Sequence, residues 1–282
     1  MMRVAVIGAT GIVGRHVLPR LHEHGHEVRV VAPGEADVEA LRRLGVEAMQ
    51  GDIFDLHSLR QAIKGCSAAL HLATAAPRPG QTPNWALNDR IRREGTANLL
   101  EACRSVGVQR YVQQSLAFLV GGTSDLVDET TPLLPATQAA GSAIDAERLV
   151  AASGLDWVIM RDGALYGPGT GREEYWRALA RSGELLLPGD GSDYISLIHI
   201  ADLAECFVLA TERGASGLIA SVVDDEPTTY QELFTYIALL DGAAVPAAGG
   251  ESHFPSFRVA NFKAREILGW RPFYHSYRSG LA

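Results

Sequence analysis

Residues 4–21, "VAVIGATGIVGRHVLPRL", decide how the chain begins. An apolar β-branched run leads into Gly8, Gly11 and Gly14, and an amphipathic helical pattern follows. Glycine at these places lets the chain turn tightly, brings the backbone close to a phosphate and packs the helix against the strand. The free N–H groups at the start of such a helix favour an anion. The stretch therefore predicts a strand–loop–helix unit that holds the pyrophosphate of a dinucleotide.

The same alternation continues outward from this unit. Short apolar stretches of strand type recur at 27–32, 46–50, 68–73, 110–115 and 156–161, with helical patterns between them. Apolar strands that alternate with helices are typical of a parallel sheet covered on both faces, and right-handed crossovers make that sheet doubly wound. The sequence therefore predicts an α/β fold of the Rossmann type.

The pattern changes after the turn-rich "YGPGTG" at 166–171. Two further strand-to-helix patterns follow at 195–214 and 217–240. We interpret residues 1–166 as an NAD(P)-binding Rossmann domain. Residues 167–282 are expected to form mainly a smaller C-terminal α/β cap that binds substrate, with some segments returning to the Rossmann sheet.

Composition excludes several partners. The 282 residues carry a formal charge of −8, which is no electrostatic footprint for nucleic acid. Arg90, Arg92 and Arg93 form a local basic cluster, which we interpret as a solvated helix face rather than an anion contact. Glycines and Arg15 interrupt the apolar N-terminus, so it is not read as a signal peptide, and no apolar run is long enough for a bilayer. We expect a cytoplasmic protein with no nucleic-acid or membrane partner.

From "GATGIVG" (8–14) to "LGWRP" (268–272) the chain resembles the extended branch of the short-chain dehydrogenase/reductase superfamily, the NAD-dependent epimerase/dehydratase type. "GDIFD" (51–55), "HLATA" (71–75), "GTANLLEACRSVGVQRYV" (95–112) and "RDGALYGPG" (161–169) carry the resemblance in the family's order. It implies a small-molecule substrate, and it suggests a homodimer through two long helices.

The resemblance also implies which residues line NAD or NADP. They are Gly8, Thr10, Gly11, Ile12, Val13, Gly14, Asp52, Ile53, Leu72, Ala73 and Thr74. An acid at the end of the second strand would hold the ribose hydroxyl of NAD, and an arginine would accept the phosphate of NADP. Pro33 and Gly34 stand there and offer neither. Glu35 or Asp37 could serve NAD and Arg15 could serve NADP, so the dinucleotide stays open.

In that family a serine, a tyrosine and a lysine serve hydride chemistry, because the tyrosine exchanges a proton with the substrate oxygen. In register, Ala139 stands at the tyrosine position and Ala143 at the lysine position. Leu116 stands at the serine position, with Ser115 just before it, and Arg92 replaces an asparagine. The resemblance therefore predicts an atypical member that lacks the Tyr-x-x-x-Lys pair.

Three side chains are candidates to replace this proton relay. Tyr166 could donate a proton or serve as a packing residue; His199 could be an acid–base group or a structural histidine; Ser115 could contact substrate. Arg161 could hold an anionic substrate group or pair internally with an acid. His22, His24 and His26 are interpreted as a solvated turn, so no metal is predicted.

Two functions fit an intact glycine loop without the usual relay. The first is a reductase or an epimerase-type enzyme that acts on a small molecule, with a conjugated double bond or an imine needing least help from a tyrosine. The second is a non-catalytic NAD(P)-binding redox sensor or structural protein. The predicted cap favours the enzyme, because a substrate-enclosing region has less use in a sensor.

Overall fold

The computed structural model describes residues 1–76, 81–82, 84–135 and 137–281. It opens with strand β1 (Arg3–Ile7) and helix α1 (Ile12–Glu23), joined by the glycine loop. Val4 and Val6 of β1 face Val17 and Leu21 of α1 in one buried apolar cluster, which is why the amphipathic stretch folds as a helix against this strand.

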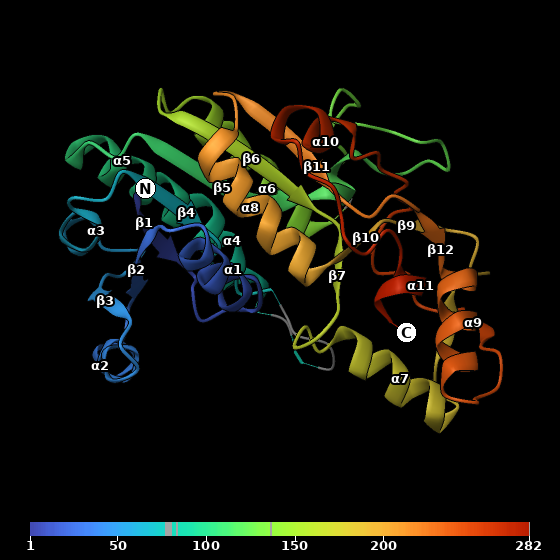
Figure 1. Ribbon diagram of the computed structural model, residues 1–282. Helices are drawn as coiled ribbons and strands as arrows, with labels where there is room; N and C mark the ends of the chain where they lie inside the picture. The colour runs from blue at the N-terminus through green and yellow to red at the C-terminus, as the bar shows by residue number, and fades with distance from the viewer. Residues whose placement is uncertain (77–80, 83, 136, 282) are drawn as a thin grey trace.

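Seven parallel strands form the central sheet (Figure 1). After β1 they are β2 (Glu27–Ala32), β3 (Glu47–Gln50), β4 (Ala68–His71), β5 (Arg110–Leu116), β6 (Asp156–Asp162) and β11 (Leu218–Val222). The spatial order is β11-β6-β5-β4-β1-β2-β3. The chain reverses its direction of winding between β1 and β4, and ligands of such sheets bind outside the carboxyl ends of the strands at that point. The predicted doubly wound Rossmann fold is confirmed.

Helices cover both faces of this sheet. One face packs against α1, α8 (Ile200–Arg213) and α10 (Phe262–Leu268), and the other against α3 (Leu56–Ile63), α5 (Thr96–Val106) and α6 (Gln138–Ala151). Helix α2 (Glu35–Arg43) lies beside β3. Helix α4 (Trp85–Arg90) continues through a π-helical turn, η1 (Ile91–Gly95), into α5. No helix among the described residues combines the length and apolarity needed to cross a membrane.

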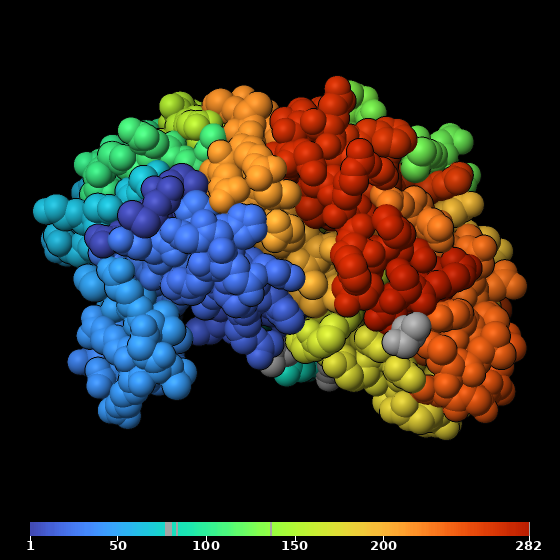
Figure 2. All heavy atoms as spheres, in the orientation of Figure 1, coloured from blue at the N-terminus to red at the C-terminus, as the bar shows by residue number. Residues whose placement is uncertain are grey.

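The remaining elements lie beside the carboxyl edge of the sheet, and most of them contribute to a second apolar cluster. They are η2 (Ala117–Val120), β7 (Ala164–Tyr166), α7 (Arg172–Ser182), β8 (Leu186–Pro188), β9 (Tyr194–Ile195), β10 (Leu197–His199), β12 (Thr228–Thr229), α9 (Tyr230–Leu240), β13 (Ala247–Gly250) and α11 (Tyr277–Gly280). The strands pair as three two-stranded sheets. The C-terminal residues, red in Figure 2, lie over the region between α8 and these elements. Two hydrogen bonds hold this segment on α8, because Asp202 accepts the backbone N–H groups of Phe273 and Tyr274.

Candidate functional site

The glycine loop is held tightly between β1, α1 and β4. Gly8 has a φ of +89°, and a Cβ there would lie 2.4 Å from the backbone nitrogen of Ala73. A Cβ at Gly14 would lie 2.4 Å from the carbonyl oxygen of Gly8 and 2.5 Å from Cα of Ala9. A Cβ at Gly11 would make only one contact, at 3.1 Å. Gly8 and Gly14 are therefore required by the fold, whereas Gly11 is free to face a ligand.

The start of α1 fits the pyrophosphate of a dinucleotide. Gly11 caps this helix, and no side chain in the described part of the chain accepts a hydrogen bond from its first N–H groups. Val13 is buried, Ile12 is half-buried and Thr10 is exposed. The loop therefore exposes backbone atoms rather than large apolar side chains. Unsatisfied N–H groups at a helix N-terminus beside β1 and β4 are a suitable site for phosphate oxygens.

The segment after β4 lies against the same loop. Leu72 is buried and donates its N–H to the Ile7 carbonyl at 2.8 Å, which continues the sheet by one residue beyond His71. The Thr74 hydroxyl donates to Oδ1 of Asn88 at 2.8 Å. The contact of Ala73 with Gly8 brings the sequence-predicted residues 72–74 next to the glycine loop.

Asp52 and Ile53 follow β3, two strands away. The exposed Asp52 accepts the Phe54 N–H at 2.9 Å, and Ile53 lies against Gly95, where a Cβ would come within 2.9 Å of its side chain. At the end of β2, the Asp37 carboxylate turns back over Gly34, while Arg15 is exposed. These placements leave the choice between NAD and NADP open.

Helix α6 presents small side chains where the family's relay is expected. Thr137 caps the helix by accepting the Ala140 N–H at 3.1 Å, and the α6 sequence contains neither tyrosine nor lysine. Ala143 is buried in the second apolar cluster and Ala139 packs against it. The α6 helix therefore offers methyl groups and no proton donor at these two positions.

Ser115 is engaged by a buried ion pair. Its hydroxyl donates to Oε1 of Glu147 at 2.6 Å, and Arg161 donates twice to the same carboxylate, at 2.9 Å and 2.6 Å. All three residues are buried. Arg161 therefore pairs internally with an acid and does not offer itself to an anionic substrate group. The same geometry favours a structural role for Ser115.

Tyr166 is fully buried beneath the C-terminal helix. A Cβ at Gly280 would come within 2.5 Å of its ring, and the Asp224 carboxylate lies near its hydroxyl. Burial and the nearby Asp224 carboxylate raise the pKa of this phenol above its usual value of 10. A buried phenol that holds its proton more tightly than usual is poorly suited to donate it, so the geometry favours packing for Tyr166.

His199 caps helix α8. Its Nδ1 accepts the Ala201 N–H at 3.3 Å, and its ring lies 3.8 Å from that of Tyr274 between centroids. Burial, with a smaller contribution from His16, lowers the pKa of His199 to about 4. The side chain is therefore neutral near pH 7, and its contacts with the C-terminal segment favour the structural interpretation.

At the carboxyl edge of the sheet, the structure leaves several buried polar atoms without partners among the described residues. The sequence allows Gln114 a contact with substrate, whereas it assigns no such role to the side chains of His71 and Asp162. Strands β4 and β6 end in His71 and Asp162, and Gln114 lies two residues before the end of β5, in register with Met160. Gln114 donates to Oδ2 of Asp162 at 3.0 Å, while Oδ1 of Asp162, Oε1 of Gln114 and both His71 nitrogens are buried without a partner in the described chain. Buried polar atoms without partners at the carboxyl edge of the sheet mark a place where a ligand completes the hydrogen bonding. The sequence signal for Asp162 is an acid that comes directly after the apolar strand predicted at 156–161.

Asp162 makes stability depend on pH. Burial raises its pKa from 3.8 to about 7, against the opposing effects of Gln114 and Arg92. Between these two pKa values the unfolded chain loses the proton while the folded protein keeps it, so stability falls as pH rises through this window. Above about pH 7 the cost reaches about 2–4 kcal/mol. We expect Asp162→Asn to be more stable than wild type by about this amount at pH 8 and equal to it near pH 3, measured by urea unfolding.

The matched control is Asp128→Asn. Hydrogen bonds from Thr130 lower the pKa of this exposed carboxyl, so its contribution is present above the unfolded pKa and is lost in acid. Asp128→Asn should therefore be less stable than wild type at pH 8. If Asp162→Asn were instead less stable than wild type at pH 8, Asp162 would be ionised in the folded protein and stabilised there by hydrogen bonds.

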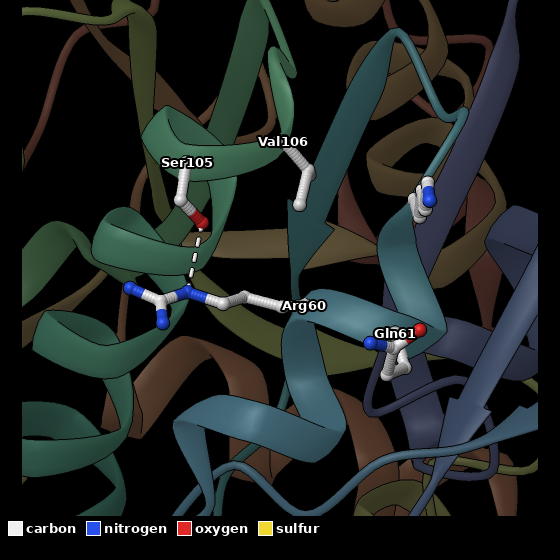
Figure 3. A pocket seen from close by; sticks show the side chains of 5 residues that line it. Arg60, Gln61, Ser105 and Val106 are labelled. Carbon is white, nitrogen blue, oxygen red and sulfur yellow. Dashed lines mark hydrogen bonds between the residues drawn. The ribbon is translucent and has the colours of Figure 1, made fainter.

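Two other features lie apart from this edge. A surface depression between α3 and α5 is lined by Arg60, Gln61, Lys64, Ser105 and Val106, with Arg60 donating to the Ser105 hydroxyl at 2.9 Å (Figure 3). His24 and His26 both contact Glu212, at 3.2 Å and 3.0 Å. The described part of the chain holds no cluster of three or more His, Cys, Asp or Glu side chains suited to a metal ion.

Comparison with known proteins finds relatives that match nearly the whole chain. The chain is 33% identical to a 3-diazoavenalumate denitrifying reductase from a Streptomyces species, over 99% of each chain. It is 28% identical to a 4-hydroxy-2-methyl-3-oxo-4-farnesyl-3,4-dihydroquinoline-1-oxide ketoreductase from Stigmatella aurantiaca, covering 96% of this chain and 81% of the relative. A UDP-glucose 4-epimerase from Thermus thermophilus, solved in complex with NAD, superimposes with a TM-score of 0.82 at 25% identity, over 99% of this chain and 96% of the epimerase.

A family model covers most of the chain as well. The model of the NAD dependent epimerase/dehydratase family matches residues 4–223, which include the glycine loop, the strand ends at 71 and 162, and helix α6. The sequence-based resemblance is thereby confirmed: the chain belongs to the NAD-dependent epimerase/dehydratase family of the extended short-chain dehydrogenase/reductase superfamily.

Proposed function

We propose that the protein is an NAD(P)H-dependent reductase of a small, electron-poor molecule, and that a diazo or diazonium compound is the substrate class. The observation that carries the proposal is the combination of a glycine loop that fits a dinucleotide with an α6 helix that has alanine at positions 139 and 143. This combination retains a place for a hydride donor and lacks the usual proton donor.

The chemistry explains why such a substrate suits this helix. A bound nicotinamide dinucleotide supplies a hydride. When a ketone accepts a hydride, negative charge grows on oxygen and an acid must neutralise it. When a diazonium group accepts a hydride, the C–N bond breaks, a C–H bond takes its place and dinitrogen leaves. The donor is oxidised, the diazonium compound is reduced, and no proton is consumed.

The relative from Streptomyces supports this choice. Its name describes the reduction of a diazo carboxylate with loss of nitrogen, and it matches this chain from end to end. The ketoreductase and epimerase relatives support hydride chemistry of the family in general, without favouring a diazo group.

In this scheme, the protein's own residues bind the dinucleotide and enclose the substrate. The glycine loop and residues 72–74 hold the dinucleotide, with Asp52 and Ile53 on its adenosine side. The methyl groups of Ala139 and Ala143 leave room beside it for a flat substrate, and Leu116 and Phe118 add apolar surface in the same cluster. Dispersion and exclusion of water, rather than acid catalysis, would position the substrate.

Location and assembly follow as part of the proposal. Cys66, Cys103 and Cys206 are buried and free, which suits a reducing compartment such as the cytoplasm. We infer a homodimer through α5 and α6, the two long helices of one face, where Leu149 leaves an apolar side chain partly exposed.

A panel of substrates tests the proposal. Purified protein is mixed with NADPH or NADH and an aryl diazonium carboxylate, an enone, an imine or a ketone, and dinucleotide oxidation is followed together with release of nitrogen gas. We expect turnover of the diazonium compound at a rate at least about 100-fold above that of the ketone, since one absent acid–base group is worth about two to four orders of magnitude. Dinucleotide binding without turnover of any of them would instead support the non-catalytic alternative.

A further inference from the structure

One arginine of the basic cluster points into the site. Arg90 and Arg93 face outward from α4 and η1, where they pair with Glu94 at 2.7 Å and Asp145 at 2.8 Å. Arg92 turns toward α6 instead, and its Nη1 donates to the carbonyl oxygen of Ala139 at 2.6 Å. The expectation of a solvated face therefore holds for two of the three arginines, and Arg92 lies beside the position of the family's tyrosine.

Arg92 is a half-buried cation without an ion-pair partner among the described residues. Burial lowers its pKa to about 10, so it remains charged near pH 7. Asp162 and Asp89 are near enough to influence its pKa, but among the described residues no carboxylate lies at ion-pair distance from it. Asp89 is occupied by Gln138, which donates to it at 2.7 Å. The guanidinium is half-buried and none of its nitrogens is among the buried atoms that lack a partner, so an anion from outside the chain can reach its remaining donors.

Within the described chain, most hydrogen-bond donors of Arg92 are free for that anion. The Ala139 carbonyl uses one of the five guanidinium donors, and the described residues offer no acceptor to the other four. Ala139 and Ala143 are apolar and small, and Oδ1 of Asp162 is unpartnered. The site therefore combines one cation with an apolar wall and open hydrogen-bonding positions.

We propose that Arg92 is the anion anchor of the substrate, binding a carboxylate or phenolate oxygen of a flat, mainly apolar molecule beside Ala139. This inference rests on the proposed function in taking the anchored molecule to be the substrate of the reductase. A guanidinium donates two parallel hydrogen bonds to a carboxylate, so the anchor would fix the substrate's orientation as well as its charge. Arg92 would thus set specificity for anionic substrates.

Ligand binding without turnover tests the anchor. The probes are 4-hydroxycinnamate, which offers both groups, its methyl ester, which offers only the phenol, and 4-methoxycinnamate, which offers only the carboxylate. A fourth probe, methyl 4-methoxycinnamate, is the neutral methoxy methyl ester and offers neither group. Calorimetry is done with and without NADP. We expect wild type to bind at least one of the two acids about 10- to 100-fold more tightly than the neutral methoxy methyl ester, as loss of a charge-assisted hydrogen bond implies. The probe that keeps this advantage identifies the carboxylate or the phenolate as the anchored group.

Variants assign the preference to Arg92. Arg92→Gln should bind the charged probe about 10- to 100-fold more weakly while binding the neutral ester as wild type does, and Arg92→Lys should keep part of the preference. Arg93→Gln, one residue away and outward-facing, should behave as wild type. Arg92→Met removes a charge that has no partner in the described chain, so its melting temperature should stay within about 5 °C of wild type.

The opposing outcomes are distinct. The anchor would be overturned if wild type bound both acids no more tightly than methyl 4-methoxycinnamate, or bound none of them. It would also be overturned if Arg92→Gln kept the wild-type preference for the charged probe. A large fall in the melting temperature of Arg92→Met would show that Arg92 is structural. If charge-selective binding persists while no hydride is transferred to any substrate, the proposed reductase fails and the anchor stands.

Discussion

Gly14→Ala should abolish binding of NAD and NADP and lower the yield of folded protein. A methyl group at this position would lie 2.4–2.6 Å from three backbone atoms of Gly8 and Ala9. Backbone cannot rotate away as a side chain can, so α1 must move off β1 and its N-terminus leaves the phosphate site. We expect affinity for both dinucleotides to fall at least about 100-fold, a loss of about 3 kcal/mol or more, measured by quenching of protein fluorescence.

Two other glycines separate binding from folding. Gly11→Ala creates one contact of 3.1 Å, so the protein should fold and bind dinucleotide more weakly. Gly141→Ala meets nothing within 4 Å inside helix α6, so it should stabilise the protein by up to about 1 kcal/mol and leave dinucleotide binding unchanged. A Gly14→Ala protein that binds NAD as wild type does would show that the loop does not cradle the dinucleotide.

Glu147→Ala should be strongly destabilising. Glu147 and Arg161 are 4% and 2% exposed, and they share two hydrogen bonds of 2.6 Å and 2.9 Å. Removing the carboxylate leaves the guanidinium buried, charged and without its counter-ion, which costs about 3–5 kcal/mol. The free energy of unfolding in urea measures this loss directly, provided that unfolding is two-state.

Substitutions of two nearby residues, Ser115 and Asp145, provide a comparison for the loss of stability in Glu147→Ala. Ser115→Ala removes one hydrogen bond to a carboxylate that Arg161 still holds, so it should cost about 1 kcal/mol and leave hydride transfer unchanged. Asp145→Ala lies on the same helix, but its pairs with Arg93 and Arg148 are exposed, so it should cost less than about 1 kcal/mol. If Ser115→Ala abolished turnover without loss of stability, Ser115 would be catalytic after all.

The fold could be predicted because its signals are local. Strand-type runs, the spacing of three glycines and the helical pattern after them each depend on residues near one another in sequence, and together they specify a parallel sheet. The residues at the carboxyl ends of β1, β3 and β4 could be placed for the same reason, because parallel strands all end at one edge.

The neighbours of individual polar side chains could not be predicted in this way. Arg92 looks like its exposed neighbours in the sequence, and only the turn of η1 toward α6 separates it from them. Ser115 and Tyr166 look available as single residues, whereas Glu147 and Gly280, distant in sequence, engage one and cover the other. Asp162 could not be recognised because the significance of an acid at a strand end depends on what surrounds it in three dimensions.

Transfer of deuterium tests most directly whether this chain moves a hydride without a tyrosine. The protein is incubated with an aryl diazonium carboxylate and NADPH or NADH deuterated at nicotinamide C4, in separate samples for the two faces of the ring, and the product is examined by mass spectrometry and NMR. We expect one face only to deliver deuterium, to the ring carbon that carried the diazo group, with dinitrogen released in equal amount. Product without deuterium from either face, or no product while both dinucleotides bind, would contradict hydride transfer by this protein.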